Sequence, residues 1–114
     1  MIKSSVIGFL YRTVVKPLLF KTDPEWIHDI AVKVGTFCGK YKSTRGFVKS
    51  CLYYSNKALE QDILGMHFSN PVGLAAGFDK DARMIDVTGP LGFGFTEIGS
   101  ITGEPCLGNP KPRL

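Results

Sequence analysis

The chain has 114 residues, of which 44% are hydrophobic, and a formal net charge of +4 at pH 7. This length is typical of one domain, and the apolar content excludes a chain that is disordered by composition. The 3 cysteines are an odd number without C-x-x-C spacing, which favours reduced thiols over a disulfide framework or a zinc site. The two histidines lie far apart in the sequence, so we expect no metal centre.

The charge is divided unevenly along the chain. Residues 1–58 contain ten Lys or Arg and three Asp or Glu, whereas residues 59–114 contain four and seven. A basic N-terminal half indicates a segment that faces something anionic, either a membrane surface or a nucleic acid. The basic residues are not interleaved with aromatic ones as on a single-strand-binding platform. We therefore favour a membrane surface and expect no nucleic-acid partner.

Residues 5–20 have the spacing of an amphipathic helix. Arg12 and Lys16 lie opposite an apolar stripe, and Pro17 is expected to end or kink the helix. Such a helix can lie in a membrane interface, although an ordinary helix packed on a core has the same pattern. The two cations argue against a membrane span, and no signal-peptide cleavage pattern follows. The stripe comprises Ile7, Leu10, Val14 and Leu18.

Asp23 and Pro24 predict the start of a second helix, because Asp caps free N–H groups and Pro fits the first helical position. This helix is expected to run to about Gly39. The two helices would form a hairpin whose inner faces enclose an apolar tunnel for a long hydrophobic ligand. Residues 40–58 are polar and basic and predict a linker with about one helical turn. The stripe expected on the second helix is Ile27, Ile30, Ala31, Val34 and Phe37.

Residues 59–70 predict two short strands around Leu64 and Gly65, followed by an apolar run over residues 71–77. An apolar run of this length between turn-forming residues predicts a buried strand. The run ends in small residues, which leave room for a flat ligand, and then in Asp79-Lys80-Asp81. In βα architectures ligands bind at this end of the strands. A buried strand followed by a solvated charged turn is the alternative.

Residues 79–90 predict a helix that ends at Gly89-Pro90, and residues 96–100 predict a second buried strand. The glycines at 92, 94 and 99 precede and enter a strand and lack the dinucleotide-binding spacing, which disfavours a nicotinamide cofactor. A strand, a helix and a strand in succession fit the first units of a βα barrel. The expected fold class is therefore α/β.

Four segments, in this order and spacing, resemble class 2 dihydroorotate dehydrogenases, the quinone-dependent, membrane-associated members of that family. They are DPEWIHDIA (23–31), NPVGLAAGFDKDA (70–82), GFGFTEIGSIT (92–102) and GNPKPRL (108–114). The resemblance covers nearly the whole chain. It implies an N-terminal two-helix membrane-associated hairpin in residues 1–42, a linker in residues 43–58, and the first strands of a truncated (β/α)8 TIM barrel in residues 59–114.

The resemblance also implies a function: FMN-dependent oxidation of dihydroorotate to orotate with a quinone as electron acceptor, a step of pyrimidine and UMP biosynthesis. Lys80 would contact both FMN and orotate, and His28 would lie near the quinone head group. The alternatives are a surface lysine between two aspartates and an ordinary helix-surface histidine. By the same resemblance, the FMN-contacting residues are Ala76, Gly77, Phe78, Asp79, Lys80 and Ser100.

A complete (β/α)8 barrel takes about 250 residues. We therefore expect this flavoprotein chain to be a fragment that is inactive alone, with the catalytic base, a serine in the family, beyond Leu114. A non-catalytic membrane-surface module and a truncated relic are the alternatives. Gly103 and Cys106 stand where the family usually has Pro and Gln. The expected location is peripheral, on the cytoplasmic face of a bacterial membrane, with the mitochondrial inner membrane as the alternative.

Overall fold

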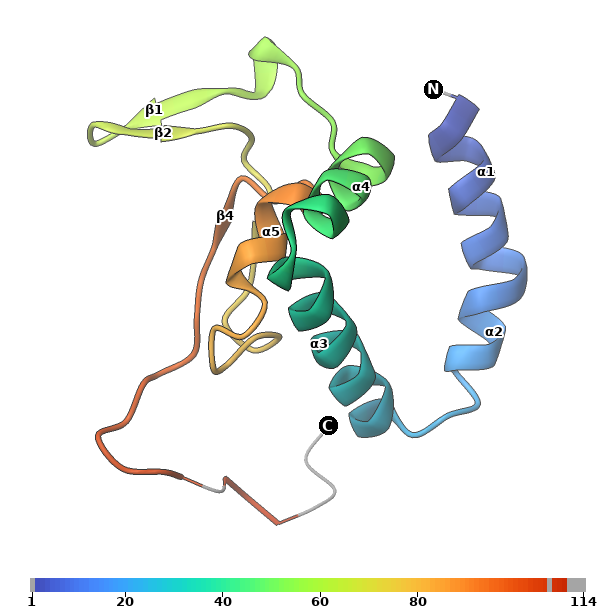
Figure 1. The fold of residues 1–114 in the computed structure, drawn as a ribbon, viewed down its shortest axis with the longest axis vertical. Helices are drawn as coiled ribbons and strands as arrows, with labels where there is room; N and C mark the ends of the chain where they lie inside the picture. Colours follow the sequence, from blue (N-terminus) through green and yellow to red (C-terminus); the bar gives the residue numbers. More distant parts are fainter. Residues whose placement is uncertain (1, 107, 111–114) are drawn as a thin grey trace. The chain divides into compact units, whose positions relative to one another are not determined.

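The computed structural model describes residues 2–106 and 108–110, so the part of the predicted GNPKPRL loop at residues 111–114 lies outside the described residues. The chain divides inside its third helix into an N-terminal unit, which reaches Ala31, and a βα unit, Val32–Cys106. Helices and small sheets are both present, which confirms a mixed α/β class (Figure 1). The elements are α1 (Ile2–Leu10), a π-helical turn (Tyr11–Val15), α2 (Lys16–Leu19), α3 (Pro24–Lys40), α4 (Lys42–Leu52), a 3-10 turn (Lys57–Leu59), β1 (Gln61–Ile63), β2 (Met66–Phe68), β3 (Gly73–Leu74), α5 (Ile85–Leu91) and β4 (Phe95–Thr96).

Pro17 distorts the first predicted helix but does not end it. The helix continues through α2 to Leu19, and the π-helical turn lies directly before α2. Because Pro17 has no N–H, it cannot donate the helical bond to the carbonyl of Thr13, and a wider turn accommodates the missing bond. The hydroxyl of Thr13 donates to the carbonyl of Phe9 at 2.7 Å in the same region.

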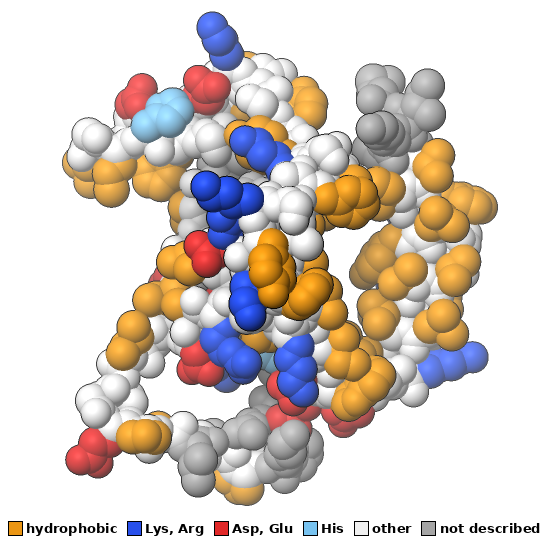
Figure 2. All heavy atoms as spheres, in the orientation of Figure 1, with side chains coloured by type: hydrophobic (Ala, Val, Ile, Leu, Met, Phe, Trp, Pro, Cys, Tyr) orange, Lys and Arg blue, Asp and Glu red, His pale blue; other side chains and the backbone are white. Residues whose placement is uncertain are grey.

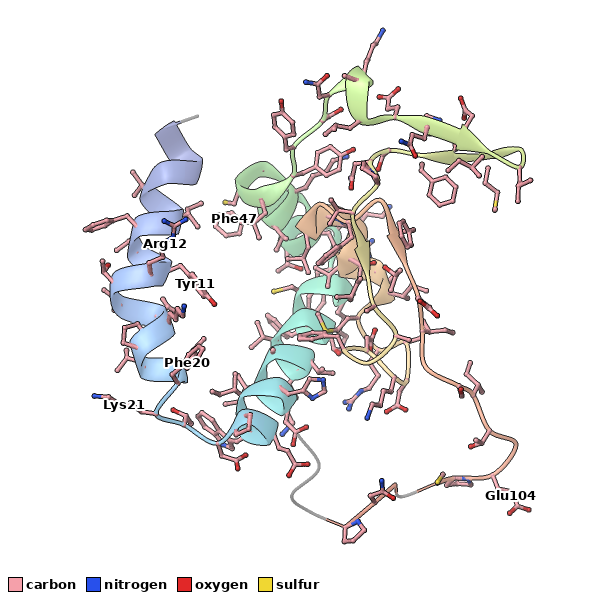
Figure 3. The ribbon with its side chains drawn as sticks, turned by 180° about the vertical axis from the view of Figure 1, so that it is seen from behind. Tyr11, Arg12, Phe20, Lys21, Phe47 and Glu104 are labelled. Carbon is pink, nitrogen blue, oxygen red and sulfur yellow. The ribbon has the colours of Figure 1, made fainter. Side chains whose placement is uncertain are left out.

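The apolar stripe of this first helical segment is exposed, as are several aromatic side chains beside it (Figure 2). Tyr11 and Phe20 belong to this exposed set, and both are labelled in Figure 3. None of the helices in the described part of the chain combines the length and the apolar character that crossing a membrane requires. The stripe comprises Ile7, Leu10, Val14 and Leu18.

The predicted start of the second helix is confirmed. The N–H of Trp26 donates to Oδ1 of Asp23 at 2.8 Å, and α3 begins at Pro24. The side chain of Asp23 therefore satisfies one of the N–H groups that a helix leaves without an internal partner. The helix ends at Lys40, one residue beyond the predicted end.

The side of α3 that packs on the core of the βα unit differs from the predicted apolar stripe, whose place in a helical hairpin stays a prediction. Val34 and Phe37 are exposed, whereas Val32, Gly35 and Gly39 are buried. The two glycines lie four residues apart and share one face of the helix. A face without side chains lets another segment approach the helix backbone closely, and hydrophobic periodicity does not report such a face.

The segment that approaches this face is the start of α5. A Cβ atom added at Gly35 would lie 2.9 Å from Sδ of Met84, and one added at Gly39 would lie 3.2 Å from Cβ of Asp86. Both distances are shorter than ordinary van der Waals contact. A side chain at Gly35 would displace the flexible end of Met84, and one at Gly39 would press on the start of α5. The buried core of the βα unit forms here, from Val32, Met84 and Val87, with Cys38, Val48 and Leu91 packed against it.

The prediction of about one helical turn within residues 40–58 is wrong, because α4 is a helix of 11 residues. The hydroxyl of Thr44 donates to the carbonyl of Cys38 at 2.7 Å, and Nη1 of Arg45 donates to the carbonyl of Gly39 at 2.7 Å. These bonds satisfy carbonyl groups at the end of α3 and tie the two helices together. The domain boundaries expected at residues 42 and 58 stay a prediction.

The two short strands predicted within residues 59–70 are present and form a β-hairpin. Strands β1 and β2 pair antiparallel, with Asp62 opposite His67, and Nδ1 of His67 lies 2.9 Å from Oδ1 of Asp62 (Figure 1). The turn residues Leu64 and Gly65 both have positive φ, 53° and 77°. Two central residues with positive φ are typical of the type I′ turn, whose twist matches that of the strands.

Strands β3 and β4 pair in parallel, with Gly73 beside Phe95 and Leu74 beside Thr96. Both are shorter than the predicted strands 71–77 and 96–100. The N–H of Glu97 donates to the carbonyl of Leu74 at 2.9 Å, so the pairing extends one step beyond the assigned strands. Since α5 lies between them in the chain, these elements form the parallel strand–helix–strand unit that the sequence predicts.

The predicted end of the intervening helix at Gly89-Pro90 is wrong. Helix α5 includes Pro90 and runs to Leu91, and it ends at Gly92, which has φ of 105°. Pro90 lies in the last turn, so its missing N–H costs one bond near the helix end. A glycine in the left-handed conformation is a common helix stop, because a side chain there would be strained.

We predict that Leu64→Asn stabilises the protein. Leu64 is 92% exposed and contributes little burial, whereas its φ of 53° suits Asn much better than Leu. The expected gain in the free energy of unfolding is about 0.5–1 kcal/mol, measured by denaturant titration. The control Leu64→Val should lower the free energy of unfolding, because a β-branched residue strongly disfavours positive φ. Equal effects of Asn and Val would contradict this turn geometry.

Candidate functional site

The candidate site is the loop that follows β3, residues 75–82. The N–H of Phe78 donates to the carbonyl of Ala75 at 3.2 Å, which turns the chain directly after the strand. Ala76 is half-buried, and Gly77 is exposed. A Cβ atom added at Gly77 would meet no atom within 4 Å, so the backbone of the loop is open on that side.

Asp79 has its carboxylate inside the βα unit. Its residue is 2% exposed, and Oδ1 accepts a hydrogen bond from the N–H of Arg83 at 2.8 Å while Oδ2 accepts one from the N–H of Met84 at 2.7 Å. Bonds to a charged acceptor are the stronger class of protein hydrogen bonds. Both carboxylate oxygens are therefore used within the chain, and they close the loop onto the start of α5.

The loop contains a strained residue between these bonding partners. Ala82 has φ of 56°, in the left-handed region that residues other than glycine seldom occupy. Its N–H donates to the backbone carbonyl of Asp79 at 3.2 Å. Such a conformation persists where surrounding bonds impose it, and here the bonds that converge on Asp79 do so.

The second predicted motif meets this loop through Gly99. A Cβ atom added at Gly99 would lie 2.9 Å from both Cα and the carbonyl oxygen of Lys80. The backbone after β4 thus lies directly against the backbone of Lys80. Ser100, the next residue, is exposed. The structure therefore brings the neighbourhoods of Lys80 and Ser100 together, as expected at the carboxyl ends of parallel strands.

Asn70 and Gly94 hold the opposite ends of the same two strands. The Asn70 side chain is buried, accepts from the N–H of Val72 at 2.9 Å and donates to the carbonyl of Gly92 at 3.0 Å. A Cβ atom added at Gly94 would overlap the carbonyl oxygen of Asn70. The strand pair is consequently held at its entrance as well as at the site.

Four of the six predicted FMN-contacting residues are without a hydrogen bond or ion pair in the described part of the chain. Ala76, Gly77, Lys80 and Ser100 make no hydrogen bond or ion pair with another described residue. In particular, the Lys80 ammonium forms no ion pair with Asp79 or Asp81 among the residues the structure covers, and the assignment of Lys80 to a ligand site stays a prediction. N–H donors, an open backbone, an ammonium and a hydroxyl suit the edge of a flavin ring, and FMN fits this donor set.

His28 belongs to the N-terminal unit. It is half-buried on α3, and its Nδ1 lies 3.9 Å from Oδ1 of Asp29. Within residues 2–106 and 108–110, no group of three His, Cys, Asp or Glu side chains is placed to hold a metal ion.

Sequence reasoning missed three features of this site: the inward carboxylate of Asp79, the strain at Ala82 and the contact of Gly99 with Lys80. A signal existed for the first. An aspartate shortly before a predicted helix start can accept from nearby backbone N–H groups, but the spacing here, four and five residues, is longer than that of an N-cap. Nothing in the sequence signals the contact with Gly99.

The parallel strand–helix–strand unit, with the candidate loop at its strand ends, places the chain among α/β proteins built from βα units. The family model described as dihydroorotate dehydrogenase matches residues 58–114. The match spans half of the chain, which therefore belongs to the dihydroorotate dehydrogenase family.

Relatives over most of the chain agree. The chain is 43% identical over 106 residues to the dihydroorotate dehydrogenase (quinone) of Christiangramia forsetii, covering 92% of this chain and 31% of the relative. It is 45% identical over 102 residues to the protein of the same name from Acidithiobacillus ferrooxidans, covering 88% of this chain and 28% of the relative. The chain thus spans about a third of the length of these relatives.

A solved structure is similar as well. The crystal structure of DHODH in complex with ferulenol from Eimeria tenella matches with a TM-score of 0.57 and 41% sequence identity. The match covers 80% of this chain and 22% of that chain. This degree of identity supports both the family and the fold of the matched part.

We predict that Ala82→Gly stabilises the protein and Ala82→Val destabilises it. Glycine relieves the strain at φ of 56°, whereas a β-branched residue increases it. The free energy of unfolding should rise by about 0.5 kcal/mol with Gly and fall by about 1–3 kcal/mol with Val, as measured by denaturant titration. A stabilising effect of Val would show that the loop does not adopt this conformation.

Proposed function

We propose that this chain forms part of an FMN-dependent dihydroorotate dehydrogenase that passes electrons to a quinone, in pyrimidine biosynthesis. The observation that carries the proposal is the unengaged Lys80 ammonium beside an open backbone at the ends of β3 and β4. The names of the relatives, dihydroorotate dehydrogenase (quinone), agree with it. Because the chain spans about a third of those relatives, we assign the complete activity to a longer polypeptide. A non-catalytic membrane-surface module is the less favoured alternative.

In this proposal the backbone of the loop would hold the flavin ring, and the Lys80 ammonium would supply a positive charge beside it. The N–H groups and open side of Ala76 and Gly77 would hold the flavin ring, with Phe78 beside them and Ser100 donating from the end of β4. When bound, FMN supplies the two-electron acceptor for the oxidation of dihydroorotate. The catalytic base, a serine in the family that the chain resembles, would lie elsewhere in the longer polypeptide.

Lys80 has the central role in this proposal. A fixed ammonium at the flavin edge stabilises negative charge that develops there during hydride transfer. The same ammonium can form a charge-assisted bond with the carboxylate of the substrate. Neither role is compatible with an ammonium already paired to Asp79 or Asp81, and Lys80 forms no such pair with the described residues.

We predict that Lys80→Ala, introduced into the full polypeptide that the host produces, removes most of the dihydroorotate dehydrogenase activity. Dihydroorotate-dependent quinone reduction should fall by about 10²-fold or more, the usual cost of removing one preorganised charge donor. Flavin content, measured by absorbance, should remain close to that of the unsubstituted protein because the backbone contacts remain.

The control for this experiment is Lys57→Ala. Lys57 is exposed on a short 3-10 turn outside the candidate site, so its removal should leave the rate unchanged. Near-normal turnover of the Lys80→Ala protein would contradict the role of Lys80. Absence of flavin from the unsubstituted protein would contradict the proposed function as a whole.

For the N-terminal unit we propose a membrane-surface role, at the cytoplasmic face of a bacterial membrane or at the mitochondrial inner membrane. The exposed apolar side chains of α1 and α2, together with Arg12 and Lys16, have the chemistry of a helix that lies in a lipid interface (Figure 2). We also propose that these helices form a two-helix hairpin through which the quinone enters, with His28 near the head group of the quinone.

We predict that the double variant Leu10→Glu and Leu18→Glu lowers the binding of the protein to anionic lipid vesicles at least about tenfold. Each leucine that enters the lipid is worth about 1.5–3 kcal/mol, and both leucines are exposed. The measurement is co-sedimentation with vesicles. The matched control is Leu64→Glu, an exposed leucine in the β1–β2 turn, which should bind normally. An equal loss in the control would contradict a membrane role for α1 and α2.

A further inference from the structure

We propose that Asp79 is a positioning residue: its carboxylate fixes the backbone of the loop that presents Lys80, and does not itself contact the cofactor. The inference deepens the proposed function and rests on it. It assigns to Asp79 a task different from the direct FMN contact that family resemblance implies.

The first observation is that both carboxylate oxygens of Asp79 accept a backbone hydrogen bond within the chain. At 2% exposure, Asp79 accepts from the N–H of Arg83 at 2.8 Å and from that of Met84 at 2.7 Å. A third bond joins the N–H of Ala82 to the backbone carbonyl of Asp79 at 3.2 Å. Each carboxylate oxygen is engaged by a backbone N–H, and the burial of Asp79 leaves its carboxylate almost no surface that a ligand could contact.

The second observation is the position of Lys80 within the closed loop. Lys80 lies between Asp79 and the strained residue Ala82. A Cβ atom added at Gly99 would lie 2.9 Å from both Cα and the carbonyl oxygen of Lys80. Its backbone is thus confined from both sides. Its side chain is exposed and makes no hydrogen bond or ion pair with another described residue. The confined backbone fixes the point from which the Lys80 side chain extends, and its ammonium is available to a bound ligand that would hold it in place.

The third observation is the contrast with Asp81. Asp81 flanks Lys80 on the other side, is exposed, and makes no hydrogen bond or ion pair with the described part of the chain. Both aspartates place a negative charge next to Lys80 in the sequence. Only Asp79 accepts the bonds from Arg83 and Met84. Asp81 is therefore a matched control that removes the neighbouring charge without removing those bonds.

The test uses Asp79→Asn and Asp81→Asn, each alone and combined with Lys80→Ala, in the protein as its host produces it. An Asn side chain has one acceptor oxygen, so it loses one bond and points an N–H₂ group at a backbone N–H. We expect Asp79→Asn to slow flavin reduction by dihydroorotate at least tenfold with flavin content unchanged, and Asp81→Asn to change it less than twofold. In the Lys80→Ala background, Asp79→Asn should add less than a twofold effect.

This lack of additivity separates positioning from a general structural role, because a structural defect would slow both backgrounds equally. A full additional effect of Asp79→Asn in the Lys80→Ala background would overturn the proposal, and so would an equal loss with Asp81→Asn. If Asp79→Asn does not yield folded protein, Asp79→Ser, which keeps one short acceptor, is measured in its place against the same criteria.

A second measurement does not depend on activity. Amide hydrogen exchange of Arg83 and Met84 should accelerate at least tenfold in Asp79→Asn and remain unchanged in Asp81→Asn. Unchanged exchange in Asp79→Asn would overturn the proposal. An unsubstituted protein that oxidises no dihydroorotate would overturn the proposed function, and the exchange rates would then still decide whether Asp79 holds the loop.

Discussion

The buried carboxylate of Asp79 is the interaction on which the geometry of the site depends. Its bonds to the N–H groups of Arg83 and Met84 close the loop after β3 and fix the start of α5. A buried charge without partners would be destabilising, so these bonds also contribute to the stability of the βα unit. One side chain therefore links the stability of the βα unit to the conformation of its candidate functional loop.

Close backbone approach is the second constraint, and glycine provides it at each contact. Gly35 and Gly39 let α5 approach α3, Gly94 lies against the carbonyl of Asn70, and Gly99 lies against the backbone of Lys80. The buried core of the described unit is correspondingly small, comprising Val32, Met84 and Val87. Specific backbone contacts and buried hydrogen bonds thus organise a unit in which few side chains are fully buried.

Local signals predicted the parts of this structure that local interactions determine. Asp23 and Pro24 marked the start of α3, and residues 59–70 indicated a hairpin whose turn falls at Leu64 and Gly65. The strand–helix–strand order and the loop with Lys80 were also predictable from the sequence. The candidate site followed from an apolar run that ends in Asp79-Lys80-Asp81 and from family resemblance.

Tertiary contacts determined what the sequence did not predict. Helix α4 is anchored by bonds from Thr44 and Arg45 to the end of α3, and its own pattern is weakly apolar. The core-facing side of α3 is set by Gly35 and Gly39, which hydrophobic periodicity does not register. The inward carboxylate of Asp79 depends on the turn at Ala82, whose positive φ has no counterpart in composition or spacing.

The most direct test of the central claim is the flavin content and intact mass of the protein purified from its own host. The account predicts bound FMN in a polypeptide large enough for a complete βα barrel of about 250 residues in addition to the N-terminal helices. A polypeptide of 12.5 kDa without flavin would contradict the assignment of this loop to a flavin site.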